Sequence, residues 1–266
     1  MRQPVGHYPG LRLWTALFFF FLYAPMVVLV AYSFNVNKLA MIWGGFSTRW
    51  YVKLFTTGGI GEAAMNSLLV AVIATCIAVA IAIAAALVLV REAGFRGAGL
   101  SNALISMPLI VPEIVTAVAT LMFFVMLKNW IGFDLGLGNI IIAHCVFCIP
   151  FAFMPIRARL QDMDLALEQA ARDLYADAWK AFRFVTLPLL MPGVVAGAML
   201  AFVISLDDFI ITQMISGPGT TTLPVYIYSM IRNGITPEVN AASTILIAVS
   251  TALVTVYWYV SRPKKT

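Results

Sequence analysis

Long apolar stretches alternate with short polar segments along the whole 266-residue chain. Six of these stretches are close to the roughly 20 residues that an α-helix needs to cross the hydrocarbon layer of a bilayer. They cover about 13–33, 64–89, 102–127, 138–156, 193–215 and 241–260. Because backbone polar groups inside lipid must be satisfied within the segment, the pattern predicts an all-α, polytopic membrane protein. We expect a single transmembrane domain over residues 1–266.

The composition agrees with this interpretation. Hydrophobic residues make up 62% of the chain and charged residues 11%, which is far from the average of soluble domains. The first span is too long for a signal peptide, and Tyr32-Ser33-Phe34 offers no small-residue cleavage site, so we expect it to be retained. Cys76, Cys145, Cys148 and His144 fall within spans, where we predict packed thiols and a packed, hydrogen-bonded histidine.

The basic residues predict the orientation of the chain. If the N-terminus lies inside, the outer segments hold five of the 17 Lys and Arg residues, which leaves 12 for the inner segments. The outer five are Lys38, Arg49, Lys53, Lys128 and Arg232. This bias favours both termini in the cytoplasm. The net charge of +5 is then a consequence of topology, and we expect no nucleic-acid partner.

Only three of the 12 acidic residues, Glu113, Asp207 and Asp208, fall within predicted spans. An ionisable residue in lipid is costly and is expected to face a pathway or a partner. On a continuous third span, Glu113 is predicted about 17 Å from the inner end, near the midplane. The spans contain no Lys or Arg, so three carboxylates favour a cationic solute. The alternative is that each carboxyl is protonated or hydrogen-bonded to a neighbouring helix.

The fifth span separates the two aspartates. A stripe of small and polar residues runs along it, made of Gly193, Gly197, Ala201, Ser205 and Thr212. On a continuous helix, Asp208 lies near the middle of this stripe and Asp207 about 100° away. We therefore expect Asp208 to face the substrate pathway more directly than Asp207.

The inner connection at about 157–192 is charged and amphipathic. Apolar residues recur there at intervals of three and four, which predicts a helix with one apolar face over 165–183. One interpretation is a helix that lies on the membrane surface, but such helices usually carry a basic polar face. This one is charge-balanced, which favours a protein groove as its binding partner.

The stretch 168–188, EQAARDLYADAWKAFRFVTLP, resembles the EAA loop of permease subunits of type I ABC importers. The residues that the resemblance assigns to ATPase coupling are Glu168, Gln169, Ala170, Ala171, Asp173, Leu174, Tyr175, Leu187 and Pro188. Gln169 stands where the family has Glu, and Tyr175 stands where it has Gly. Because Tyr is costly at positive φ, we expect the turn here to be looser or placed differently.

Further segments resemble the spermidine/putrescine branch of that family: 32–35 (YSFN), 45–51 (GFSTRWY), 112–115 (PEIV), 205–208 (SLDD), 216–219 (SGPG) and 236–241 (TPEVNA). The resemblance implies a permease of the bacterial inner membrane that imports polyamines such as putrescine or spermidine by alternating access. It also implies a second permease, two ATPase subunits and a periplasmic binding protein as partners. The alternatives are an ABC permease for another solute and, in a different class, a secondary transporter.

Motifs for catalysis within the chain are missing. The sequence contains no G-x-x-x-x-G-K-[ST] and no H-E-x-x-H, and its two histidines make no metal site. We expect a permease that is not itself an enzyme and binds no cofactor, with ATP and Mg²⁺ held by the partner ATPase.

Overall fold

The computed structural model describes residues 10–38, 42–56, 59–92, 94–132, 136–234 and 236–260. Within these ranges the regular secondary structure is helical, apart from one isolated bridge between Asn35 and Phe46, and short loops connect the helices. The helices are α1 (Leu11–Ser33), α2 (Arg49–Thr56), α3 (Ile60–Arg91), α4 (Ala98–Ile110), α5 (Glu113–Ile131), α6 (Leu137–Gln161), α7 (Leu165–Asp173), α8 (Ala178–Ala181), η1 (Phe182–Thr186, a π-helix), α9 (Leu187–Asp207), α10 (Ile210–Ile215), α11 (Leu223–Arg232) and α12 (Pro237–Val260).

The prediction of six membrane spans is confirmed, but two of the predicted spans are each divided between two helices. Six described helical segments are long and apolar enough to cross a bilayer: Leu11–Ser33, Ile60–Arg91, Glu113–Trp130, Leu137–Gln161, Ala178–Asp207 and Pro237–Thr255. The predicted third span, 102–127, is divided between α4 and α5, and the predicted fifth span, 193–215, is divided between α9 and α10. The termini at 1–9 and 261–266 lie outside the described residues, so their cytoplasmic location stays a prediction.

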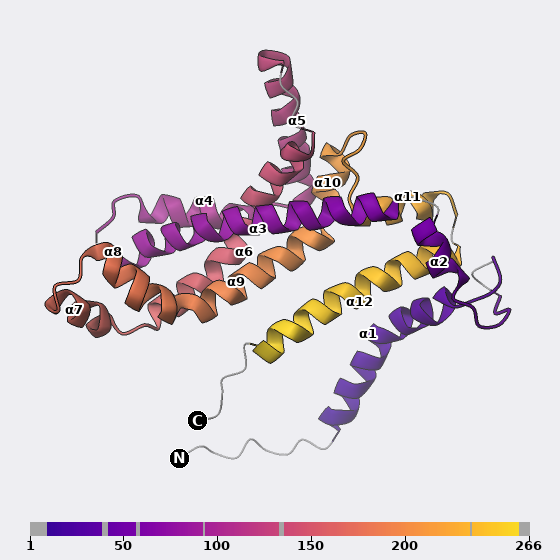
Figure 1. Ribbon diagram of the computed structural model, residues 1–266, viewed down its shortest axis with the longest axis horizontal. Helices are drawn as coiled ribbons and strands as arrows, with labels where there is room; N and C mark the ends of the chain where they lie inside the picture. The colour runs from indigo at the N-terminus through magenta and orange to yellow at the C-terminus, as the bar shows by residue number, and fades with distance from the viewer. Residues whose placement is uncertain are drawn as a thin grey trace. The chain divides into compact units, whose positions relative to one another are not determined.

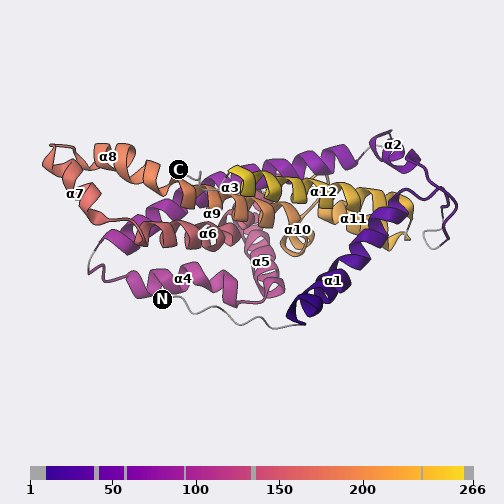
Figure 2. The ribbon, with the colours of Figure 1, turned by 90° about the horizontal axis from the view of Figure 1, so that it is seen from below.

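The chain divides into two units, and residues 59–226 with 249–266 form the larger one. In this unit α3, α6 and α9 run side by side, as the two ribbon views show (Figures 1 and 2). Helix α4 lies along α6, and α10 packs against α5, which stands across the bundle (Figure 1). The short helices α7 and α8 lie at one end of the bundle.

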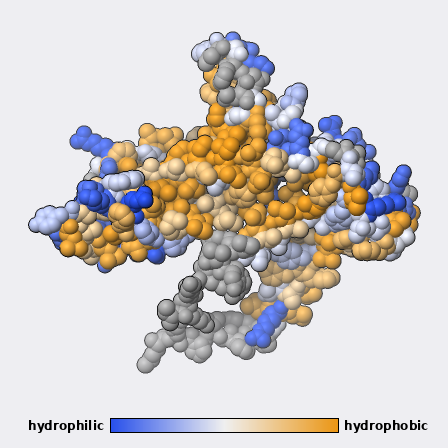
Figure 3. Space-filling model, viewed as in Figure 1, coloured by the Kyte–Doolittle hydropathy of each residue, from blue (hydrophilic) through white to orange (hydrophobic). Residues whose placement is uncertain are grey.

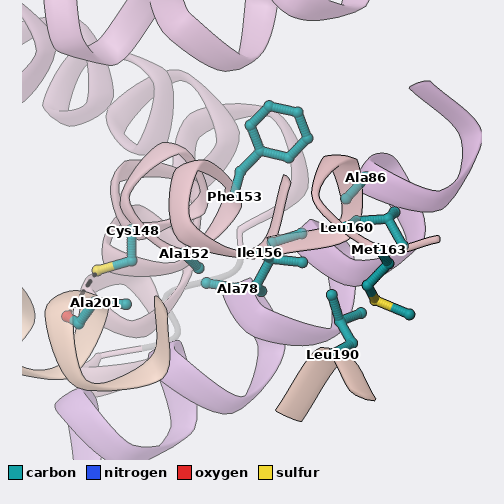
Figure 4. Packing of buried hydrophobic residues seen from close by; sticks show 11 residues of the cluster. Ala78, Ala86, Cys148, Ala152, Phe153, Ile156, Leu160, Met163, Leu190 and Ala201 are labelled. Atoms are coloured by element: carbon teal, nitrogen blue, oxygen red, sulfur yellow. Dashed lines mark hydrogen bonds between the residues drawn. The ribbon is translucent and has the colours of Figure 1, made fainter. Parts of the chain in front are cut away.

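Small residues let these three helices approach closely. Helix α3 contributes an alanine on each successive turn, at Ala74, Ala78, Ala82 and Ala86, and all four are fully buried. The larger side chains of α6, such as Phe153 and Ile156, fill the remaining space (Figure 4). In lipid, where apolar side chains gain little from contacting one another instead of acyl chains, such close packing supplies much of the association energy.

The outer face of the bundle is apolar. Large side chains on α3 and α5 are exposed in the isolated chain, among them Leu69, Ile73, Val115 and Met122. In the space-filling view, hydrophobic residues cover the middle of the bundle and hydrophilic residues gather at the α7–α8 end (Figure 3). This distribution suits a body embedded in lipid with its α7–α8 end in water.

The smaller unit contains residues 1–58 and 227–248. Its loop after α1 is built around the buried side chain of Asn35, whose Oδ1 accepts hydrogen bonds from the backbone N–H groups of Asn37 and Gly44. The indole of Trp50 donates to the Asn35 carbonyl at 2.6 Å. An ion pair of 2.6 Å joins Lys53 to Glu238 in the first turn of α12. These contacts give the loop between α1 and α2 a defined conformation and join α2 to the start of α12.

Candidate functional site

Asp208 lies at a break in the predicted fifth span. Helix α9 ends at Asp207, and Asp208 has an extended backbone with ψ 129°. Its carboxylate turns toward the start of α10, where Oδ2 accepts from the backbone N–H of Thr212 at 3.0 Å and from its hydroxyl at 2.8 Å. A carboxylate at a helix N-terminus satisfies backbone donors that have no partner in the helix. Asp208 therefore ends one helix and caps the next.

His144 of α6 bridges the two sides of this break. Its Nδ1 lies 2.7 Å from the Ser205 hydroxyl on α9, and its Nε2 lies 3.0 Å from the Thr212 hydroxyl on α10. Nε2 is also 3.2 Å from Oδ2 of Asp208, and the side chains of both residues are 1% exposed. The prediction of a packed, hydrogen-bonded histidine is confirmed. Its role in linking α9 to α10 was missed, because a sequence pattern does not reveal a contact between distant segments.

Glu113 reaches the same place from α5. The predicted position in the middle of one continuous span was wrong, because the helix breaks at Val111-Pro112 and Glu113 begins α5. Proline at 112 has no N–H and its ring disfavours a helical backbone at Val111, which has ψ 132°. The half-buried Glu113 carboxyl interacts with the carboxyl of Asp208. The structure thus brings together two of the three predicted pathway acids.

One oxygen of this pair has no hydrogen-bond donor. Oδ1 of Asp208 is buried and unpartnered, whereas all donors to Asp208 reach Oδ2. Two carboxylates offer each other acceptors only, so a proton or a cation must supply the missing donor. Among the described residues, no Lys or Arg forms an ion pair with either acid. The arrangement is suited to a ligand that carries a positive charge and N–H groups.

Asp207 is not part of this pair. Its Oδ1 accepts a hydrogen bond of 3.1 Å from the hydroxyl of Ser250 in α12, and the residue is exposed. The two aspartates therefore differ in their surroundings, and that Asp208 faces the substrate pathway more directly than Asp207 stays a prediction. The stripe of small residues that was used to separate them is divided, because Ser205 and Thr212 contact His144 while its two glycines pack against a helix. Gly193 and Gly197 pack against the backbone and side chains of α6.

An apolar groove lies on the helices near the acidic pair, although neither acid lines it. It has a volume of about 540 Å³ and is lined by α4, α5, α6 and α10. Its wall includes Thr116, one turn after Glu113, together with Ala143 and Ile211, the chain neighbours of His144 and Thr212. The same helices thus hold two carboxylates and a surface that suits methylene groups.

The predicted coupling segment consists of two short helices instead of one. Helix α7 ends at Asp173 and α8 begins at Ala178, where Asp177 caps the helix by accepting from the backbone N–H of Lys180 at 2.7 Å. That hydrogen bond holds the pKa of Asp177 below its usual value. The connection between the long helices is also shorter than the predicted 157–192, since α6 continues to Gln161.

Leu187 and Pro188 lie at the opposite end of the segment, at the start of α9. Pro188 has no N–H to give to the carbonyl four residues earlier. The π-helix η1 ends at Thr186, directly before α9. On α7, Glu168 forms a 3.0 Å ion pair with Arg91 at the end of α3, and both side chains are about 15% exposed. Gln169, Ala170, Asp173 and Leu174 are exposed, and Ala171 is half-buried.

Tyr175 makes the turn after α7. It is the one described non-glycine residue with positive φ, at 61°. Its N–H donates to the Arg172 carbonyl at 2.9 Å, and the N–H of Ala176 donates to the Ala171 carbonyl at 3.1 Å, which is the Schellman pattern usually made with Gly. The expectation of a looser or displaced turn was wrong. The left-handed backbone costs a non-glycine residue about 1–2 kcal/mol, while the Tyr175 side chain is 96% exposed.

Comparison with known proteins identifies the fold. Residues 78–262 match the family described as binding-protein-dependent transport system inner membrane component. Two solved structures resemble the chain at 18% identity. A bacterial ABC transporter involved in the import of the acidic polysaccharide alginate has a TM-score of 0.77 and covers 95% of this chain and 93% of its own. The MetNI methionine ABC transporter has a TM-score of 0.63 and covers 76% of this chain and 94% of its own.

Relatives found by sequence share a higher identity with this chain than these two solved structures do. The putrescine transport system permease protein PotI of Escherichia coli (strain K12) is 40% identical over 258 residues, which cover 96% of this chain and 92% of the relative. The spermidine/putrescine transport system permease protein PotC of Haemophilus influenzae is 36% identical over 242 residues, which cover 91% of this chain and 92% of the relative. The chain therefore belongs to the family of inner membrane components of binding-protein-dependent transport systems.

Proposed function

We propose that this protein is the permease subunit of an ATP-driven importer of polyamines, and that Glu113 and Asp208 lie on the polyamine route. A polyamine carries ammonium groups joined by methylene chains. The ammonium N–H groups match the unpartnered Oδ1 of Asp208, and the methylene chain matches the nearby apolar groove. The relatives that carry the names of putrescine and spermidine/putrescine permeases support the same substrate class.

The observation that carries this proposal is the buried carboxylate oxygen without a donor. A buried acceptor that lacks a hydrogen bond costs about 1–3 kcal/mol, and more when it is charged. The Glu113–Asp208 pair would recover this cost when an ammonium group binds. A carboxylate also attracts an ammonium more strongly in a low dielectric than in water, and two partial contacts hold it without preventing release.

The coupling segment supplies the second part of the proposal. The Arg91–Glu168 ion pair holds α7 to α3, so a force on α7 would reach a helix that spans the membrane. The exposed residues Gln169, Ala170, Asp173, Leu174 and Tyr175 would contact a partner ATPase, which holds the ATP and Mg²⁺. In this proposal a second permease, two ATPase subunits and a periplasmic binding protein complete an importer of the bacterial inner membrane.

The matched pair of adjacent aspartates tests the substrate route. The assembled transporter, reconstituted in lipid vesicles with its binding protein, would be assayed for uptake of radiolabelled putrescine. Asp208→Asn retains the shape of the side chain but removes its charge, and we expect at least tenfold slower uptake. Asp207→Asn, which changes only the contact with Ser250, should reduce uptake less. Equal effects of the two substitutions would contradict the proposed route.

The coupling surface is tested separately. Ala170 is exposed on α7, so Ala170→Arg should insert normally into the membrane but place a bulky charge at the proposed contact. We expect the ATPase to co-purify poorly with this variant and uptake to fall. Normal co-purification and normal uptake would rule out this face of α7 as the docking surface.

A further inference from the structure

His144 has no role in the route proposed so far, yet it is among the most deeply buried polar residues of the bundle. Both of its ring nitrogens are engaged, and its partners come from two helices that meet at Asp208. A histidine that served only to fill space would not need three polar contacts. The hydrogen bonds around it determine which nitrogen carries the proton, and this in turn determines what Asp208 offers to a ligand.

The proton of the imidazole must lie on Nε2. The Thr212 hydroxyl gives its one proton to Oδ2 of Asp208, so toward His144 it acts as an acceptor. Nε2 also lies 3.2 Å from Oδ2 itself, and a lone pair at that position would face another lone pair. An N–H on Nε2 satisfies both oxygens. Nδ1 lies 2.7 Å from the Ser205 hydroxyl, which can donate to a bare Nδ1 or accept from a protonated one.

The donors around Asp208 are all on one side. The backbone N–H and hydroxyl of Thr212, together with the Nε2–H of His144, converge on Oδ2. Other titratable groups near the carboxylate are Glu113 on α5 and the Cys148 thiol on α6. With Oδ2 saturated, the carboxylate cannot rotate without losing these bonds, and Oδ1 is left as the free acceptor.

We propose that His144 is a positioning residue for substrate: as an Nε2–H donor, it holds Oδ2 of Asp208 so that Oδ1 and Glu113 together receive an ammonium group. This inference rests on the proposed polyamine route and adds a residue that does not touch the solute. It assigns the function of His144 to its Nε2 side, while the Nδ1 contact with Ser205 serves only packing.

Two substitutions separate the two sides of the ring. The amide nitrogen of Gln reaches approximately the position of Nε2, so His144→Gln retains a donor toward Asp208. The amide of Asn ends approximately at Nδ1, so His144→Asn retains the contact with Ser205 but loses the donor. Both are neutral at every pH. Ser205→Ala is the matched control, because it removes the Nδ1 partner and leaves the Nε2 side unchanged.

The assay is putrescine uptake by the assembled transporter in vesicles, with the concentration of putrescine-loaded binding protein varied between pH 6 and pH 8. For His144→Asn we expect the maximal rate to fall about tenfold, the factor associated with a hydrogen bond to a charged group. The half-saturating concentration of loaded binding protein should not change, since docking occurs elsewhere. His144→Gln and Ser205→Ala should stay within about threefold of the native rate at both pH values.

Several outcomes would overturn the inference. If His144→Gln is as slow as His144→Asn, the ring does not act as an Nε2 donor to Asp208. If all three variants match the native rate while Asp208→Asn is inactive, the polyamine route stands and the positioning role is wrong. If Asp208→Asn itself transports normally, the proposed route fails first. Thermal unfolding of each complex separates these results from misfolding, and a His144→Asn variant that unfolds like the native protein yet transports normally contradicts the role directly.

Discussion

The close approach of α9 to α6 makes Gly197 a sensitive position in the bundle. A Cβ atom added at Gly197 would lie 2.5 Å from the Ala152 carbonyl oxygen and 3.2 Å from two further backbone atoms. No side-chain rotation relieves such a contact, because the neighbour is backbone. An ordinary contact begins near 3.4 Å, so the helices must separate by about 0.9 Å (3.4 − 2.5) in Gly197→Ala.

The displacement would reach the acidic site. Ser205 lies two turns further along α9, and its hydroxyl is 2.7 Å from His144. If α9 moves as a rigid rod, that distance becomes about 3.6 Å, which is outside hydrogen-bonding range. Overpacking a well-packed interior typically costs about 1–3 kcal/mol. We therefore expect Gly197→Ala to destabilise the protein by about that amount.

Gly99→Ala is the matched control. Gly99 lies in α4, and an added Cβ there would meet no atom within 4 Å. Since Ala favours a helix over Gly by about 1 kcal/mol, this variant should be as stable as the native protein or more so. Thermal unfolding in detergent and uptake in vesicles would be measured for both. If Gly197→Ala behaves like Gly99→Ala, the described packing of α9 on α6 is wrong.

Three further predictions concern the coupling segment. Tyr175→Gly should retain the turn and relieve the left-handed strain, so ATPase-driven uptake should be preserved; a large loss of uptake would instead assign the exposed ring to the ATPase contact. The cap of α8 should weaken in acid, because a carboxyl with a lowered pKa stabilises the fold above its unfolded pKa of about 3.9 and this contribution is lost as pH falls through the folded value. The protection of the Lys180 amide against hydrogen exchange, corrected for the intrinsic rate, should therefore fall as the pH is lowered toward ~3, and unchanged protection would contradict the cap. Arg91→Ala should loosen α7, so proteolysis within α7 should accelerate, whereas Glu168→Gln should do so less; equal resistance of all three proteins would remove the ion pair as an anchor.

The number of spans and the need of each intramembrane acid for a partner could be predicted because both depend on simple quantities, whereas the pairing of Glu113 with Asp208 could not. Twenty apolar residues have few alternatives to a membrane helix, and a carboxylate in such a segment requires a partner. The helix breaks were harder to predict. Asp208 interrupts an apolar run that reads as continuous, since the contact that stabilises the break comes from Thr212 on the next helix and from His144 on α6.

The turn at Tyr175 was misjudged for a different reason. Intrinsic preference disfavours Tyr at positive φ, but two Schellman hydrogen bonds and the cap of α8 by Asp177 stabilise the turn in the same place. The stripe of small residues on the fifth span was harder to interpret, since Gly193 and Gly197 pack against α6. A row of small residues indicates close approach of another group, and sequence alone does not state whether that group is a solute or a helix.

Uptake by the double variant Glu113→Gln/Asp208→Asn is the most direct test of the central claim. Both substitutions retain the size of the side chains and remove the two charges that face each other at the break between α9 and α10. In vesicles that contain the assembled transporter and the loaded binding protein, putrescine uptake should fall to the level seen without ATP. Full uptake by this variant, with the complex intact, would contradict a cation route through Glu113 and Asp208.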